Sequence, residues 1–416
     1  MAQLTGADTP PDTADLADEP SPVGGVSRNV FVLGLVSFAA DVSSEMLYPV
    51  LPIFLSTTLG TPTALIGVIE GVAEGTASTS KVASGWWSDR LPQRRPLVAA
   101  GYALSGVGKL LLALSFVWPQ ALLARFTDRL GKGTRTAPRD ALIADSSTER
   151  TRGRAFGFHR SMDTAGAVLG PLIGLALIAS LGEDRLRLVF LIAVIPAVLS
   201  VLLVQLARER VRHPAPAAAG RRRLDFSGAP RGYWVVLGIS VLFAFGNSSD
   251  AFLLLRAKDL GLSLTFIILA YVTYNISYTL LSFPAGIVAD RTTPRRVLSA
   301  GFLTFGFVYL GFSLAGSTAA IWPLFLAYGL TMALTEGVGR ALIADASPAD
   351  RRGAFVGLYH TSIGLAAVAA SIVAGVLWDQ IDPGAPFALG AATGLAAAAL
   401  LILVPSRPAA AELEAA

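Results

Sequence analysis

The chain has 416 residues, of which 53% are hydrophobic and 15% are charged, and its mean hydropathy is +0.59. Soluble domains carry about 25% charged residues, so this composition excludes one water-soluble core and predicts a membrane protein. The chain has no Cys, which excludes disulfides and thiolate metal sites, and its three His residues are too few for a His-rich metal centre.

The two ends of the chain differ in composition from the rest. Residues 1–27 contain several Pro, Asp and Glu residues and lack the basic stretch and apolar run of a signal peptide. We expect them to form a disordered cytoplasmic tail. Residues 406–416 are expected to form a short C-terminal tail.

About twenty apolar residues cross a bilayer as a helix, and the chain offers twelve such segments, numbered here as spans 1 to 12. Spans 1 to 6 are predicted at 29–57, 62–88, 96–117, 119–145, 154–181 and 186–206. Spans 7 to 12 are predicted at 232–257, 262–289, 296–315, 319–345, 354–379 and 385–405. We therefore expect an all-α membrane protein with an N-terminal six-helix bundle (28–206), a cytoplasmic linker (207–231) and a C-terminal six-helix bundle (232–405).

The two predicted bundles repeat one another. The segment that begins at Gly85 with Asp89-Arg90 returns about 200 positions later, beginning at Gly286. Ala141–Asp145 and Ala341–Asp345 are identical stretches at the same offset. Two related, mostly apolar halves are typical of a pseudo-symmetric transporter with two helix bundles.

Basic residues gather in alternate connections, after spans 2, 4, 6, 8 and 10. The opposite connections contain little more than Arg185, Arg187 and Lys258. The positive-inside rule therefore places both termini and the linker in the cytoplasm of a multi-pass cell-membrane protein. This distribution also accounts for the net charge of +4, so we expect lipid around the protein and no nucleic acid as a partner.

Three local patterns resemble the major facilitator superfamily. They are the pattern from Gly85 to Arg95 after span 2, Arg129-x-x-Lys132-Gly133 on span 4, and Gly166-x-x-x-Gly170-Pro171-x-x-Gly174 on span 5. The first is echoed from Gly286 to Arg296, the second has Lys where Gln is commoner, and the third is similar to a motif associated with drug–proton antiporters. The resemblance implies the twelve-helix fold of that group, with secondary active transport and no cofactor.

The resemblance also implies a gate at the cytoplasmic ends of the helices. Its residues would be Gly85, Asp89, Arg90, Arg94, Arg95, Gly286, Asp290, Arg291, Arg295 and Arg296. We expect Gly85 to let span 2 approach a neighbour closely, and Asp89 to bind the free N–H groups at the start of span 11. Asp290 would do the same at the start of span 5. The alternative is that these Asp-Arg pairs only end helices and fix topology.

Ionisable residues within the spans indicate a polar cavity, because charges at membrane depth are costly. Arg125, Arg129, Lys132 and Arg139 share one face of span 4, and Arg129 lies about 16 Å from the start of the span, near the midplane. We expect Arg125 and Lys132 to line the substrate cavity. Arg139 is expected to anchor the cytoplasmic interface.

Carboxylates occur at similar depth on spans 1, 2 and 5. We predict that Asp41 and Glu74, followed by Glu45 and Asp163, exchange between a proton and Arg129 as charge partner. Glu70 is predicted to line the substrate cavity. Sodium is the alternative coupling ion, and a permanently paired structural network is the alternative to coupling.

Polar side chains on the C-terminal half extend the candidate cavity. Tyr271, Tyr274, Asn275 and Tyr278 share one face of span 8, and His360 lies within span 11. We expect them to line the substrate path; polar helix packing is the alternative for each. Glu336 and Arg340, four residues apart on span 10, indicate a local ion pair.

The leading hypothesis is proton-coupled export (antiport) of a small organic compound by alternating access, which a monomer can perform. An importer of an anionic metabolite or chelate on the same fold is the alternative, motivated by the basic face of span 4. A membrane sensor is not expected, because the sequence shows no large soluble signalling domain. An enzyme is not expected, because no nucleophile–base set or metal-ligand spacing is present.

Overall fold

The computed structural model describes residues 26–88, 90–147, 152–209, 230–347 and 352–403, and the regular secondary structure of these residues is helical. The N-terminal half contains α2 (Arg28–Glu45), α3 (Leu51–Ile53), η1 (Phe54–Thr58), α4 (Thr63–Ser88), α5 (Arg95–Ala113), α6 (Trp118–Asp145), α7 (Arg152–Leu181), η2 (Glu183–Arg185), α8 (Leu186–Ile192) and α9 (Val194–Val204). The C-terminal half contains α10 (Arg231–Gly246), α11 (Ala251–Asp259), α12 (Leu264–Arg291), α13 (Pro294–Leu314), η3 (Thr318–Ala320), α14 (Ile321–Asp345), α15 (Arg352–Gln380) and α16 (Ala385–Leu403).

Helical structure occupies each range in which a span was predicted, and the predicted ends differ from those of the helices by a few residues. Within the described residues, nine helical segments are long and apolar enough to cross a membrane. The predicted spans 1, 2 and 4 are not among them. The first is divided into α2, α3 and η1, whereas α4 and α6 carry the ionisable residues that form the candidate site.

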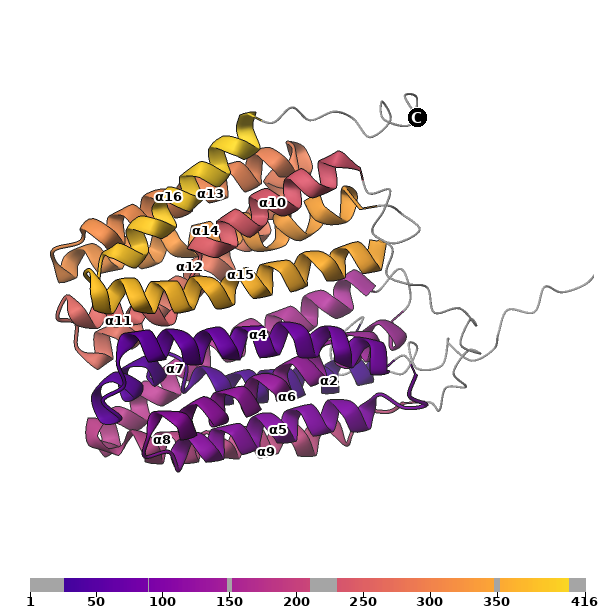
Figure 1. The fold of residues 1–416 in the computed structure, drawn as a ribbon. Coiled ribbons are helices and arrows are strands. Elements are labelled where there is room, and N and C mark those ends of the chain that lie inside the picture. The colour runs from indigo at the N-terminus through magenta and orange to yellow at the C-terminus, as the bar shows by residue number, and fades with distance from the viewer. Residues whose placement is uncertain (1–25, 89, 148–151, 210–229, 348–351, 404–416) are drawn as a thin grey trace, which may run out of the picture.

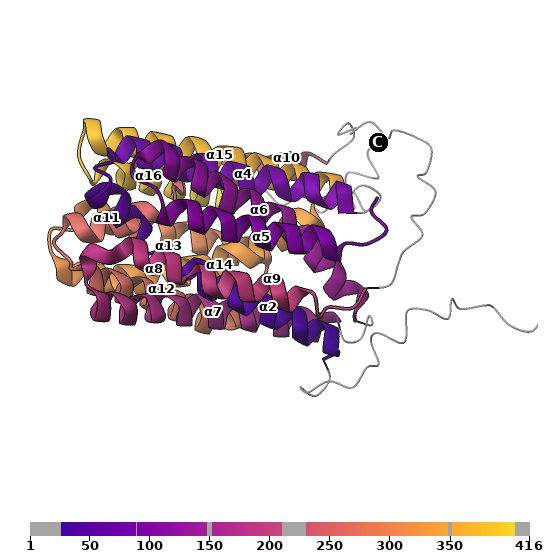
Figure 2. The same ribbon diagram turned by 90° about the horizontal axis from the view of Figure 1, so that it is seen from below.

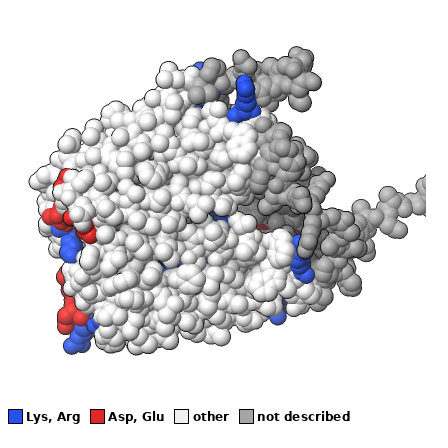
Figure 3. Space-filling model, in the orientation of Figure 1, with Lys and Arg blue, Asp and Glu red and all other residues white. Residues whose placement is uncertain are grey.

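The outer surface of the bundle has the charge distribution of a membrane protein. Figure 3 shows a broad flank almost free of charged residues, with most of the visible Lys, Arg, Asp and Glu at the two ends. We call the end where α2 begins and α16 ends the terminal end, and the other the far end. The exposed acidic residues of the far end include Glu183, Asp184, Asp259, Asp379 and Asp382.

The two halves lie side by side and contact each other through equivalent helices (Figures 1 and 2). α4 packs on α15 along one side of the molecule, and α7 packs on α12 along the other. Small residues bring the first pair close together. A Cβ at Gly67 would lie 2.2 Å from the carbonyl oxygen of Ser371, and one at Gly375 would lie 2.7 Å from the Cα of Ala64.

Two of the predicted spans break at related points. Between α2 and α3 the chain forms turns at 46–50, where Pro49 lies, and the repeat-related segment 247–250 separates α10 from α11. Proline explains the first break, because it removes a backbone donor. Pro171 differs, since α7 continues through it without interruption.

Residues at the predicted limits of the tail and linker contact the N-terminal half. Val26 and Ser27 are buried, and the Ser27 hydroxyl donates to the carbonyl of Ser146. At the start of the predicted linker, the Glu209 carboxylate accepts hydrogen bonds from the backbone N–H groups of Arg94 and Arg95. Most of the predicted tails and linker lie outside the described residues, namely at 1–25, 210–229 and 404–416.

Candidate functional site

The glycine motif of α7 packs closely against α2. A Cβ on Gly166 would lie 2.8 Å from the Cβ of Asp41, and a Cβ on Gly170 would lie 2.9 Å from the Cβ of Glu45. Gly174 makes an equally close approach to the carbonyl of Met46. The absence of side chains on this face of α7 therefore allows close packing of α2 at the turns that carry the two carboxylates.

Asp41 and Glu45 both line a small cavity of about 30 Å³ between α2, α5 and α6. Arg125, Arg129 and Lys132 line the same cavity, as the spacing on span 4 predicts. Lys132 is exposed to solvent, and neither Lys132 nor Asp41 forms a hydrogen bond or ion pair with a described residue. These residues therefore surround a small polar cavity, whose room is about that of one water molecule.

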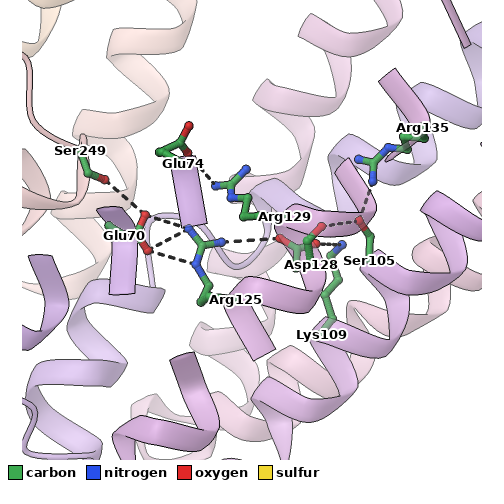
Figure 4. A network of polar contacts seen from close by, with 9 residues as sticks. All are labelled: Glu70, Glu74, Ser105, Lys109, Arg125, Asp128, Arg129, Arg135 and Ser249. Carbon is green, nitrogen blue, oxygen red and sulfur yellow. Dashed lines mark hydrogen bonds and ion pairs between the residues drawn. The ribbon is translucent and has the colours of Figure 1, made fainter. Parts of the chain in front are cut away.

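The two carboxylates of α4 each meet an arginine of α6 (Figure 4). Glu70 receives a bidentate ion pair from Arg125, with Nη2 2.8 Å from both carboxylate oxygens. Glu74 lies 3.7 Å from Nη2 of Arg129, and the Nε of Arg129 is buried without a hydrogen-bond partner. The side chain of Glu70 is 1% exposed, whereas that of Glu74 is 42% exposed. Glu70 thus forms a buried pair rather than part of the predicted cavity wall, and Glu74 is partly exposed.

The charge network continues from α6 to α5 (Figure 4). Asp128 lies 3.6 Å from Arg125 and 3.4 Å from the ammonium of Lys109. On the same helices, Arg135 donates to the Ser105 hydroxyl, which donates to the backbone carbonyl of Asp128. Lys109 was not singled out from the sequence, although a Lys inside an apolar span is a signal for such a partner.

The network extends across the interface between the halves. Ser249, at the break between α10 and α11, donates to Glu70 over 3.3 Å, and Tyr271 of α12 donates to Glu45 over 2.8 Å. At the far end, Lys258 donates to Ser56, and Asp379 accepts from the backbone N–H of Ala64. The far ends of the halves are therefore joined by specific hydrogen bonds.

A larger cavity, of about 260 Å³, lies within the C-terminal half. Its walls come from α10, α13, α14 and α15, and include Phe243, Phe302 and Met332. His360 lines it, as predicted, and Glu336 is the carboxylate that the described residues contribute to its wall. This cavity has room for an organic substrate, which the small cavity of the N-terminal half does not.

Glu336 takes part in a contact that the sequence did not predict. Arg160 of α7 lies 3.7 Å from the Glu336 carboxylate and donates to the Tyr278 hydroxyl over 2.8 Å, and Tyr278 donates to Glu336. The local ion pair predicted with Arg340 rests on a side chain outside the described ones. Arg160 could have been singled out from the sequence, because it is an ionisable residue inside span 5. The contact joins the two halves.

The predicted polar face of α12 divides into different roles. Tyr271 and Tyr278 reach the other half, as described above. Asn275 is buried, and its side-chain amide donates to the backbone carbonyl of Tyr271. The amide is therefore hydrogen-bonded within α12 rather than to the substrate path. Tyr274 is also buried, with its ring 5.1 Å from that of Tyr328, and this corresponds to the packing alternative.

Asp163 lies within α7 next to His159, with 3.6 Å between Nδ1 of His159 and the carboxylate. The other carboxylate oxygen and the His159 Nε2 are buried without a hydrogen-bond partner. Within the described part of the chain no ion pair joins Asp163 to Arg129, so the charge partner predicted for Asp163 is not found in this conformation.

Three arginines of the predicted gate contact residues of their own half. Arg94 forms an ion pair of 2.8 Å with Asp145, Arg90 lies over the Trp86 ring, and Arg295 donates to the carbonyl of Leu401. A Cβ on Gly85 would lie 3.4 Å from Ala137, an ordinary contact, so the close approach predicted there is not found with any described residue. Asp89 and the side chain of Asp290 lie outside the described parts of the chain.

Curated relatives match nearly the whole chain. An uncharacterized MFS-type transporter of Methanocaldococcus jannaschii is 35% identical over 386 residues, which cover 91% of this chain and 95% of the relative. The multidrug resistance protein MdtH of Aeromonas hydrophila is 22% identical over 378 residues, 89% of this chain and 94% of that protein. The inner membrane transport protein YajR of Escherichia coli is 24% identical over 88% of this chain and 81% of that protein.

Solved transporter structures share the fold at low identity. A POT family transporter in complex with 5-aminolevulinic acid has a TM-score of 0.78 at 13% identity, over 91% of this chain and 96% of that one. A bacterial homologue of the human lysosomal transporter Spinster has a TM-score of 0.69 at 17% identity, covering 90% and 94%. The sequence profile of the Major Facilitator Superfamily matches residues 33–255 and 235–416. The chain therefore belongs to the major facilitator superfamily of transporters.

Proposed function

We propose that the protein exports a small organic compound in exchange for protons, by alternating access between its two halves. The observation that carries this proposal is the separation of two sites. Ionisable residues surround the cavity of about 30 Å³ in the N-terminal half, and the cavity of about 260 Å³ in the C-terminal half has mostly apolar walls. The first site suits a proton, and the second suits an organic molecule.

Asp41 and Glu74 are the residues that we propose exchange protons. Asp41 faces the small cavity with no hydrogen bond or ion pair to a described residue, and Glu74 is half exposed beside Arg129. A carboxylate at membrane depth must be either paired or protonated. Each of these groups can therefore gain or lose a proton when the surrounding helices move. Glu45 and Asp163 are secondary candidates, and sodium is the alternative ion.

Rocking would break the contacts that now join the far ends and allow new contacts at the terminal end. The arginines there and the acidic far end favour a cytoplasmic terminal end. We propose that both termini are cytoplasmic, that the protein acts as a monomer in the cell membrane, and that Asp89 and Asp290 hold the terminal end closed in the outward-open state. The relative MdtH is named a multidrug resistance protein, and this name supports export as the direction of transport.

Import of an anionic compound is the second candidate, and Lys132 is the observation in its favour because it is exposed and forms no ion pair with a described residue. The arginines that first motivated this candidate are less available. Arg125 is bound to Glu70, and Arg129 lies beside Glu74.

Reconstitution into liposomes with an imposed pH gradient tests coupling. We expect the gradient to drive accumulation of a transported compound and Asp41→Asn to abolish that accumulation, while counterflow exchange without a gradient persists. Glu183→Gln is the control for loss of a carboxylate, at an exposed far-end position outside both cavities. Accumulation that follows a sodium gradient, or that survives replacement of both Asp41 and Glu74, would contradict proton coupling through these residues.

A further inference from the structure

We propose that Glu336 binds the positively charged group of an amphiphilic organic cation, and that Arg160 occupies this position when substrate is absent. The inference rests on the proposed function in one respect, namely that the larger cavity is the substrate site. It adds the chemical class of the substrate and names the residue that selects for it.

The cavity wall has the composition that an amphiphilic cation requires. Phe243 and Phe302 stack with ring centroids 4.1 Å apart, and both line the cavity together with Leu298 and Met332. Among the described residues the wall contains no Lys or Arg, so Glu336 is its fixed charge. Aromatic faces and a carboxylate both attract cations, and neither favours an anion.

Arg160 supplies the cation that Glu336 now binds. It comes from α7 of the other half and is not part of the cavity wall. Its side chain is 57% exposed, and that of Glu336 is 33% exposed, so water reaches the pair. Ion pairs open to water are weak. A ligand cation that also fills the apolar cavity can therefore displace the guanidinium.

Displacement of Arg160 would have a consequence beyond binding. Arg160 joins α7 to Tyr278 on α12 and to Glu336 on α14, and thus connects the N-terminal half to the C-terminal half. A cation at Glu336 would remove this connection. Occupation of the substrate cavity would then free the halves to move, which ties substrate binding to the conformational change.

The test is a binding measurement on the full chain in lipid nanodiscs, with empty nanodiscs to measure partition into lipid. The probes are tetraphenylphosphonium, tetraphenylborate and triphenylphosphine oxide, which are similar in shape and differ in charge. We expect the cation to bind more tightly than the other two. Glu336→Gln should weaken cation binding by on the order of tenfold or more, with little effect on the neutral probe.

The variant Arg160→Gln gives the distinctive result. Because it removes the internal competitor, we expect it to tighten cation binding by about fivefold. The double variant should behave like Glu336→Gln. Arg185→Gln is the matched control, since Arg185 is exposed at the far end, away from both cavities. If Glu336→Gln does not fold, Glu336→Asp withdraws the charge by one methylene and should give a measurable loss of affinity.

Unchanged cation binding in the Glu336 variants, weaker binding in Arg160→Gln, or preference for the borate would overturn the inference. These outcomes are separate from failure of the proposed function, because equilibrium binding does not depend on a proton gradient. Proton-driven export of a compound whose binding ignores both variants would leave the proposed function intact and refute this assignment alone.

Discussion

Replacement of Gly170 by Ala tests whether the glycine face of α7 positions α2. The added Cβ would lie 2.8 Å from the carbonyl oxygen of Val42 and 2.9 Å from the Cβ of Glu45, whereas ordinary contacts begin at 3.4 Å. The helices must therefore separate by about half an ångström, because a close-packed interface has no free space to absorb the methyl group.

The magnitude follows from two opposing effects. Overpacking costs about 1–3 kcal/mol, and the higher helix propensity of Ala returns about 1 kcal/mol. Gly157→Ala on the same helix is the control, since a Cβ there would meet no atom of the described residues within 4 Å. We expect Gly157→Ala to be neutral or slightly stabilising, and Gly170→Ala to be less stable than this control by about 1–3 kcal/mol.

Two assays apply to this pair of variants. Unfolding in mixed micelles gives the difference in stability. Because the chain has no Cys, a single introduced pair of cysteines can carry spin labels on α2 and α12, and we expect Gly170→Ala to change the distance between them, since Glu45 of α2 is bound to Tyr271 of α12. Equal stability and equal distances in the two glycine variants would refute the reasoning.

Two further predictions concern the charged network. Arg125→Met should destabilise the protein by about 3–5 kcal/mol because it leaves the 1% exposed carboxylate of Glu70 unpaired; Arg296→Met, at an exposed position, should change the unfolding free energy by less than about 0.5 kcal/mol, and an equal loss in both variants would contradict the network. Tyr271→Phe removes the hydrogen bond to Glu45, so spin-label distances across the far end should shift toward separated halves; an unchanged distance distribution would show that this bond does not hold the far end closed.

Much of the fold could be predicted from the sequence. Helical spans depend on the length of apolar runs, and the repeat from Gly85 and Gly286 shows two related halves directly. The α4 and α6 helices were also found in this way, although their charges make them poor spans. The sequence also indicates that the charged spans surround a polar cavity. An ionisable side chain in hydrocarbon needs a polar partner, whichever helix it packs against.

The composition and order of residues thus determined that the protein is a helical membrane protein with two repeated halves. They also determined that its second and fourth spans carry ionisable residues. Only the tertiary structure decided that Glu70 is buried against Arg125 while Glu74 is partly exposed, and that Glu336 meets Arg160 of the other half. The physical reason is helix rotation. Which face of an apolar helix meets which neighbour is set by packing against partners distant in the chain, and no local pattern contains that information.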